Sequence, residues 1–122
     1  MQFITTRGAG QPVSAARAIC LGLAGDGGLF VPEQFPSVDL HQALAQPDYP
    51  ALAAFILEQF LTDYDPAFLR QTVRQVYGGA FGEGTAPLHK AGDGMYSLEL
   101  WHGPTCAFKD FALQLMPRLL VE

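Results

Sequence analysis

The first third of the chain predicts short elements separated by turn residues. Residues 2–6 predict a short strand, and Ser14 can cap a helix over residues 15–23 by accepting a hydrogen bond from its first turn. A glycine-rich turn then ends that helix. Residues 29–31 predict a second extended piece, which stops at Pro32 because proline cannot donate to a sheet ladder.

The middle of the chain predicts two helices. Residues 50–61 are apolar on most sides, which is typical of a helix packed by neighbours on more than one face. The next helix is marked by Asp65 at the N-cap, Pro66 at the first helical position and a glycine stop. Its apolar positions recur at helical spacing: Leu69, Val73, Val76 and Tyr77. Arg70 and Arg74 share one of its faces, and we interpret them as a solvated stripe.

The last third predicts a hairpin and then a helix. Residues 88–91 and 95–101 flank Gly92-Asp93-Gly94, a three-residue loop whose glycines can take positive φ. After the strand break at residues 102–104, a helix is predicted over residues 106–116.

Two residues mark the bounds of that last helix. Thr105 can cap its start. Pro117 should kink or end it near Met116, because proline removes a backbone donor. The predicted architecture at this end is therefore strand, tight turn, helix.

Composition narrows the class of protein. The 122 residues are 49% hydrophobic, enough for one core but too few for two sizeable domains. The net charge of −5, with seven basic among 12 acidic residues, argues against nucleic-acid binding. No apolar run reaches the roughly 18 residues that a membrane span needs. The start lacks a secretory signal, and two cysteines make a disulfide framework improbable, so we expect a cytoplasmic protein.

Lys109 is the least expected residue of the last predicted helix. At about 100° per residue, Leu113, Met116 and Leu120 fall around it on the helical wheel, so the lysine lies on the apolar face. Burial and the positive end of the helix dipole would both disfavour an ammonium there. A neutral amine is the nucleophile that Schiff-base formation with an aldehyde requires. The alternative is that Lys109 extends its ammonium from the helix end into water.

The segment around Lys109 also carries a specific motif. It runs Leu98-Glu99-Leu100-Trp101-His102-Gly103-Pro104-Thr105-Cys106-Ala107-Phe108-Lys109-Asp110-Phe111-Ala112. This string closely resembles the pyridoxal-phosphate attachment motif of threonine synthases, roughly L-E-L-[FW]-H-G-P-T-x-A-F-K-D-F. Cys106 stands where the family often has leucine, and Pro117 is unexpected, but neither change touches the lysine.

A second segment agrees with this resemblance. Thr6-Arg7-Gly8, residues 18–23 and Asp26-Gly27-Gly28-Leu29-Phe30-Val31-Pro32-Glu33 resemble the family's amino-terminal signature. The similarity thus runs along the whole chain.

The resemblance implies a fold and a division into domains. The fold would be mixed α/β: a helix-rich amino-terminal domain with short strands, from a fold-type II (tryptophan synthase β-like) enzyme. Residues 1–95 would form that domain, and residues 96–122 would begin the catalytic domain that binds pyridoxal phosphate.

The resemblance also implies a reaction and a site. Lys109 would be the catalytic and cofactor-binding residue, with pyridoxal 5′-phosphate as cofactor. O-phospho-L-homoserine and water would give L-threonine and phosphate, by a carbon–oxygen lyase reaction. Thr105, Phe108 and Asp110 would position the lysine, an expectation that rests on adjacency.

Much of such an enzyme would be missing from these residues. Threonine synthases are several hundred residues long, and this sequence contains no G-x-G-x-x-G or P-loop pattern. We therefore expect a truncated amino-terminal fragment that is inactive alone and self-associates through exposed apolar faces.

Other functions are possible on the residues alone. His102 and Cys106 are four apart and could form a metal pair or an activated thiol, but Gly103-Pro104 argues against a helix between them and no further ligands are at hand. We predict no metal site. His41 and His89 are interpreted as surface or packing residues. The alternative activities are a related enzyme acting on another phosphorylated hydroxy amino acid, or a non-catalytic folding or interaction module.

Overall fold

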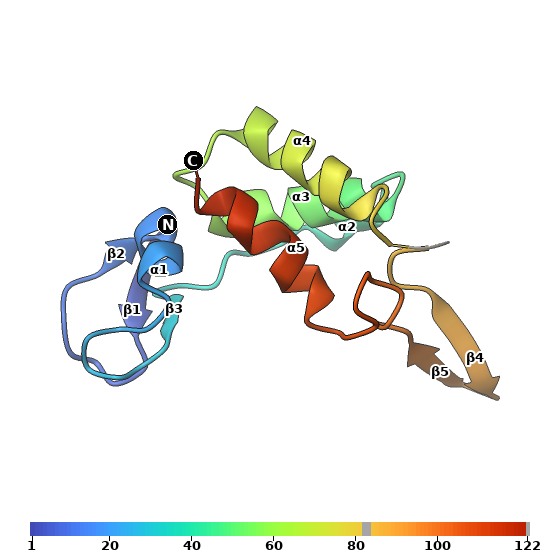
Figure 1. Ribbon diagram of the computed structural model, residues 1–122, viewed down its shortest axis with the longest axis horizontal. Coiled ribbons are helices and arrows are strands. Elements are labelled where there is room, and N and C mark those ends of the chain that lie inside the picture. Colours follow the sequence, from blue (N-terminus) through green and yellow to red (C-terminus); the bar gives the residue numbers. More distant parts are fainter. Residues whose placement is uncertain (82–83, 122) are drawn as a thin grey trace.

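A small antiparallel sheet forms one end of the molecule. The computed structural model describes residues 1–81 and 84–121. Strands β1 (Gln2–Thr5), β2 (Val13–Ser14) and β3 (Phe30–Pro32) are arranged in the order β2-β1-β3 (Figure 1). Because β3 is an edge strand, Pro32 can end it while pairing with Phe3 on one side only. Both strands predicted here are confirmed.

Helix α1 (Ala15–Leu21) follows β2 directly. The Ser14 hydroxyl accepts a hydrogen bond from the Arg17 amide at 3.3 Å, which confirms the predicted cap. The helix ends two residues earlier than predicted, because Gly22 has a φ of 67° and leaves the right-handed helix. A second cap comes from far along the chain: the Asp63 carboxylate accepts a hydrogen bond from the Ala16 amide at 2.9 Å.

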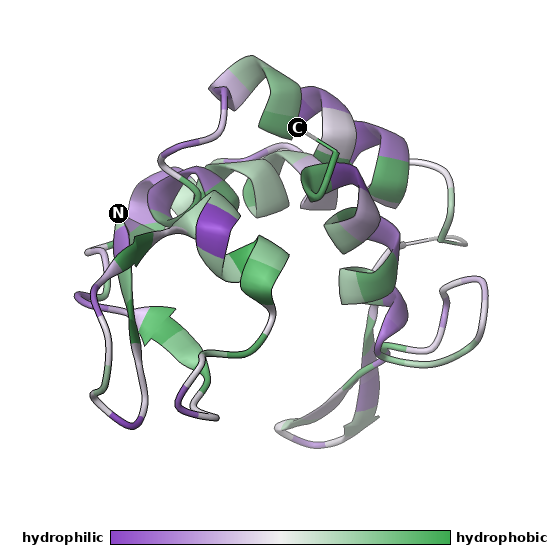
Figure 2. Ribbon diagram, turned by 60° about the vertical axis from the view of Figure 1, so that its left-hand side comes forward, coloured by the Kyte–Doolittle hydropathy of each residue, from purple (hydrophilic) through white to green (hydrophobic). Residues whose placement is uncertain are grey.

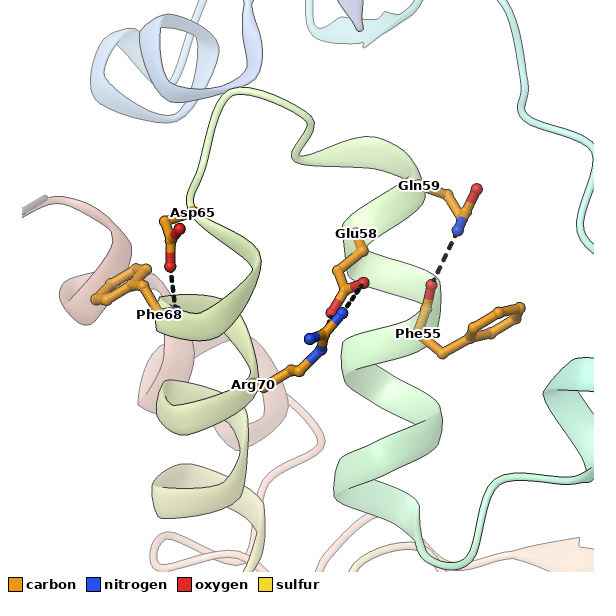
Figure 3. Close-up of polar contacts among 6 residues, drawn as sticks. All are labelled: Phe55, Glu58, Gln59, Asp65, Phe68 and Arg70. Carbon is orange, nitrogen blue, oxygen red and sulfur yellow. Dashed lines mark hydrogen bonds and ion pairs between the residues drawn. The ribbon is translucent and has the colours of Figure 1, made fainter.

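Four helices form the main layer: α2 (Leu40–Leu44), α3 (Tyr49–Phe60), α4 (Pro66–Tyr77) and α5 (Asp110–Leu119). Helix α4 has the predicted bounds and cap: the Asp65 carboxylate accepts a hydrogen bond from the Phe68 amide at 2.8 Å (Figure 3). Most residues of α3 are half-buried on every side, as its sequence predicts.

The two arginines of α4 are exposed, and both are paired. Arg70 makes a two-point ion pair with Glu58 of α3, at 2.7 and 3.0 Å (Figure 3). The Arg74 guanidinium lies 3.9 Å from the Asp48 carboxylate. The predicted solvated stripe is therefore confirmed, and its charges link α4 to α3 and to the residue before α3.

The core lies where α3, α4 and α5 meet. Its buried residues include Ala54, Leu61, Leu69, Val73, Val76, Leu115 and Leu119. Aromatic rings close one end of it: the Phe81 and Phe111 ring centres are 4.8 Å apart, and the Tyr77 hydroxyl donates to the Phe111 carbonyl at 2.7 Å. Burial, helped by the nearby Tyr49, raises the pKa of Tyr77 to about 12, so this donor keeps its proton.

A hairpin forms the other end of the molecule. Strands β4 (Leu88–Gly92) and β5 (Met95–Leu98) pair antiparallel, with Gly92 opposite Met95. The loop is therefore Asp93-Gly94, one residue shorter than predicted, and Gly94 takes a φ of 72°. The second strand stops at Leu98 and does not reach residue 101. The sheet and the hairpin lie on opposite sides beneath the helical layer (Figure 2).

Candidate functional site

Lys109 stands at the start of α5. It occupies the N-cap position, and its carbonyl accepts hydrogen bonds from the amides of Ala112 (3.0 Å) and Leu113 (2.9 Å). Its side chain is exposed. Among residues 1–81 and 84–121 no hydrogen bond or ion pair holds its amino group. A primary amine in this state can react with an aldehyde that reaches it from solvent.

Helix α5 begins four residues later than the sequence predicts, at Asp110 rather than Cys106. Cys106 has a left-handed backbone with a φ of 58°, and its amide donates to the Gly103 carbonyl at 3.1 Å. A left-handed residue cannot continue a right-handed helix. Residues 103–106 therefore form a turn, and Thr105 does not cap the helix as predicted.

Asp110 holds this turn against the helix. Its side chain is completely buried, and its two carboxylate oxygens accept hydrogen bonds from the Thr105 amide (2.8 Å) and the Thr105 hydroxyl (2.7 Å). Burial raises the pKa of Asp110, but the hydrogen bonds from Thr105, together with the backbone of Ala107, outweigh burial and bring the pKa below its ordinary value. Both residues lie close to Lys109 in the sequence, but no sequence pattern predicts that they bind each other.

Gly103 packs directly against the Asp110 carboxylate, which fits there because glycine has no side chain. A Cβ atom on Gly103 would lie 2.5 Å from the Asp110 Oδ2 atom and 2.6 Å from its Cβ atom. Both distances are far inside van der Waals contact, so no larger residue fits without moving the carboxylate. The glycine of the motif is thus explained by packing against Asp110.

The face of α5 around Lys109 is exposed, and our expectation that it buries the lysine is wrong for this chain. Leu113 is 51% exposed, Met116 43% and Leu120 45%. The core instead takes the neighbouring sector, with Leu115 and Leu119 both buried. The apolar arc of α5 is wider than the single face that α4 and α1 cover. An uncovered apolar face therefore adjoins Lys109.

A groove of about 340 Å³ adjoins this face. It lies between α5, α1 and the small sheet, and Met116 is the α5 residue that lines it. The other walls are apolar and include Phe3, Ala18, Ile19, Leu29 and Phe30. The exposed face of α5 thus continues into an apolar groove formed by the amino-terminal part of the chain.

Pro117 does not end α5 near Met116: the helix continues to Leu119, so this part of the sequence prediction is wrong. The backbone N–H that proline lacks would lie in the last turn of the helix, and tertiary contacts hold that turn in place. Leu119 is buried in the core, and its carbonyl accepts a hydrogen bond from the Tyr64 hydroxyl at 3.0 Å. Arg118 adds a hydrogen bond to Gln75 of α4 at 3.0 Å.

Asp26, in the last segment of the amino-terminal signature, binds the residues on either side of the first segment. Its carboxylate accepts hydrogen bonds from the Thr5 hydroxyl (2.7 and 2.9 Å), the Gly28 amide (2.8 Å) and the Ala9 amide (3.2 Å). The Thr5 hydroxyl and then the Gly28 amide hold the pKa of Asp26 below its ordinary value, against some desolvation. Asp26 thus joins the loop after β1 to the loop before β3.

The predicted alternatives do not come together as a metal or thiol site. The partner of His102 is Glu99 and not Cys106: the His102 Nε2 atom lies 2.7 Å from a Glu99 carboxylate oxygen, and the His102 ring stacks on Trp101. Both cysteines are free and exposed. Among the described residues no group of three or more His, Cys, Asp or Glu side chains could hold a metal ion.

His41 on α2 and His89 on β4 are exposed, as interpreted from the sequence. Within the described part of the chain, no helix is both long and apolar enough to cross a bilayer.

Comparison with known proteins identifies the family. A sequence model described as "Threonine synthase N terminus" matches residues 2–77. The threonine synthase of Pseudomonas aeruginosa is 37% identical over 98% of this chain, which is 26% of that protein. The one from Methylobacillus glycogenes is 38% identical over 98% of this chain and 27% of its own length. The chain therefore spans about a quarter of the length of these relatives.

The fold agrees with the sequence comparison. The crystal structure of pyridoxal-phosphate-bound threonine synthase from Brucella melitensis matches with a TM-score of 0.90 and 35% identity, over 98% of this chain and 26% of that one. This likeness confirms the expected fold class: a mixed α/β, helix-rich amino-terminal part of a fold-type II enzyme. The chain belongs to the threonine synthase family, in which it corresponds to the amino-terminal part.

Proposed function

We propose that this chain is the amino-terminal quarter of a threonine synthase, with pyridoxal 5′-phosphate attached to Lys109. The observation that carries the proposal is the exposed amine of Lys109, held at the start of α5 by a loop with the family's attachment motif. The amine fits the aldehyde group of the cofactor. The chain has no glycine-rich phosphate-binding pattern, so the cofactor phosphate would need residues from the rest of the enzyme.

The proposed reaction converts O-phospho-L-homoserine and water to L-threonine and phosphate. When bound, pyridoxal phosphate withdraws electrons from the amino acid and stabilises negative charge on its carbon atoms. Lys109, once displaced by the substrate's amino group, would take the proton from Cα and move protons at Cβ. Phosphate leaves from Cγ, which ends as a methyl group, and the hydroxyl of water adds at Cβ.

The domain division and location belong to the same proposal. We place the amino-terminal domain at residues 1–95 and the start of the catalytic domain at residues 96–122, a boundary that falls inside β5. The family model ends earlier, at Tyr77, which leaves the hairpin and α5 outside it. A cytoplasmic location is supported by the two exposed, unpaired cysteines, which a reducing compartment would keep as thiols.

A chimera tests the proposal. This chain would replace the matching amino-terminal quarter of the Pseudomonas aeruginosa threonine synthase, and threonine and phosphate would be measured with O-phospho-L-homoserine. Lysine occurs at only two positions, Lys90 and Lys109. We expect Lys109→Ala to abolish product formation and Lys90→Ala, on the exposed hairpin, to leave it unchanged.

Three outcomes would contradict the proposal. Turnover by the Lys109→Ala chimera would remove the lysine from the mechanism. Turnover of O-phosphoserine but not O-phospho-L-homoserine would favour the related enzyme on another phosphorylated hydroxy amino acid. A folded chimera that binds no pyridoxal phosphate would favour a non-catalytic module.

A further inference from the structure

Asp110 and Thr105 form a closed unit directly beside Lys109. Asp110 is the one charged residue among the largest fully buried side chains of the described residues. Both of its oxygens accept hydrogen bonds from Thr105, from its amide at 2.8 Å and from its hydroxyl at 2.7 Å. Charge-assisted bonds of this kind are stronger than neutral ones, and a buried carboxylate is costly without them.

The geometry of the turn depends on this unit. Cys106 takes the left-handed conformation, which costs energy for a residue with a Cβ atom, so another contact must hold it. The Asp110–Thr105 bonds bracket this strained position, because Thr105 directly precedes Cys106 and Asp110 follows it by four residues. Gly103 closes the unit, since a Cβ atom there would collide with the Asp110 carboxylate.

We propose that Asp110, bound to Thr105 and seated on Gly103, is a positioning residue that fixes the start of α5 and thereby the amine of Lys109. Asp110 is the first residue of the helix, and the Lys109 carbonyl receives the amides of Ala112 and Leu113. Loss of the Thr105 bonds frees the loop at residues 103–106, and the first turn of α5 then frays. The catalytic meaning of this role rests on the proposed attachment of the cofactor to Lys109.

The first test needs no cofactor. Amide hydrogen exchange of the 122-residue chain is measured for wild type, Asp110→Ala and the control Asp65→Ala, which removes an equivalent 2.8 Å carboxylate-to-amide bond at the start of α4. We expect Asp110→Ala to speed exchange at Thr105, Ala112 and Leu113 by about tenfold or more, and Asp65→Ala to speed it at Phe68 alone. Unchanged protection of Ala112 and Leu113 in Asp110→Ala would overturn the inference.

The second test reports the amine itself. The chimera is mixed with pyridoxal phosphate, reduced with borohydride and mapped by mass spectrometry, so that labelled Lys109 and Lys90 are counted separately. We expect Asp110→Ala to reduce labelling of Lys109 by about tenfold to a hundredfold, the loss that a displaced reactive group suffers. Labelling of Lys90 is the internal control and should not change.

Two conservative variants of Thr105 control for misfolding of Asp110→Ala. Thr105→Ser keeps both hydrogen bonds to Asp110, and Thr105→Val loses only the one from the hydroxyl. A positioning role predicts Lys109 labelling near wild type in the serine variant and lower labelling in the valine variant. Equal labelling in the two, or an equal loss in Asp65→Ala, would overturn the inference. No labelling of Lys109 in the wild-type chimera would instead overturn the proposed function, and the exchange experiment would still decide the role of Asp110.

Discussion

The Tyr64 hydroxyl donates a hydrogen bond to the Leu119 carbonyl at 3.0 Å, across 55 positions of sequence. The two side chains are 6% exposed, so the bond is made in the core. It ties the last turn of α5 to the turn between α3 and α4. This is the turn that contains Pro117, where the helix has one backbone donor fewer than usual.

Tyr64→Phe is therefore expected to destabilise the fold while keeping the ring in place. The change leaves a buried carbonyl without this donor, and we expect the free energy of unfolding to fall by about 1–3 kcal/mol. Urea unfolding followed by circular dichroism measures the loss. Tyr96→Phe, on an exposed strand of the hairpin, is the control and should change stability by less than about 0.5 kcal/mol. Equal effects of the two changes would contradict the assigned role.

Pro117→Ala is expected to stabilise the chain. Alanine restores a backbone donor inside α5 and removes the ring that crowds the preceding turn, so unfolding should cost about 1–2 kcal/mol more. Pro66→Ala is the matched control, because proline at the first helical position of α4 loses no intrahelical bond. A Pro117→Ala variant less stable than wild type would show that the proline is needed where it is.

Acid should weaken the amino-terminal loops through Asp26. Its pKa is lower in the folded chain than its ordinary value of 3.8, mainly through the Thr5 hydroxyl and then the Gly28 amide. Asp26 therefore stabilises the fold above its unfolded pKa, and this contribution is lost as the pH falls through the folded value.

Asp26→Asn tests this pH dependence. We expect the variant to be less stable than wild type at neutral pH and to lose less stability between neutral pH and pH values below 3.8. Thermal unfolding at a series of pH values measures both. Asp93→Asn, in the exposed hairpin turn, serves as the control. If the stability of wild type and of Asp26→Asn falls equally steeply as the pH is lowered, Asp26 is not responsible for the acid sensitivity.

The uncovered face of α5 is expected to cause self-association of the chain alone. Leu113, Met116 and Leu120 present a continuous apolar stripe beside an apolar groove. Sedimentation of wild type should show mass increasing with concentration, and Leu113→Glu together with Leu120→Glu should reduce it. Leu44→Glu, at a leucine of α2 that is 75% exposed, is the control. A wild-type chain that stays monomeric at all concentrations would refute this prediction.

Local signals in the sequence determined the elements whose causes are local. Asp65, Pro66 and Gly78 fixed both ends of α4, because caps and stops act within a single turn. Ser14 fixed the start of α1 in the same way. The motif around Lys109 indicated the family without any structure, since its residues are contiguous, and the comparisons confirm that family.

Only the tertiary structure decided the features that depend on distant or left-handed residues. The positive φ of Cys106 and the bond from Thr105 to Asp110 delayed α5, and neither has a periodic signal. The Tyr64 hydroxyl stabilises the turn that contains Pro117 by binding the Leu119 carbonyl, which lies 55 residues further along the chain. A helical-wheel projection of the sequence shows that α5 is apolar over a broad arc. Which part of this arc is buried depends on where α4 and α1 pack against it. For that reason Lys109 is exposed here, although its neighbours on the wheel are apolar.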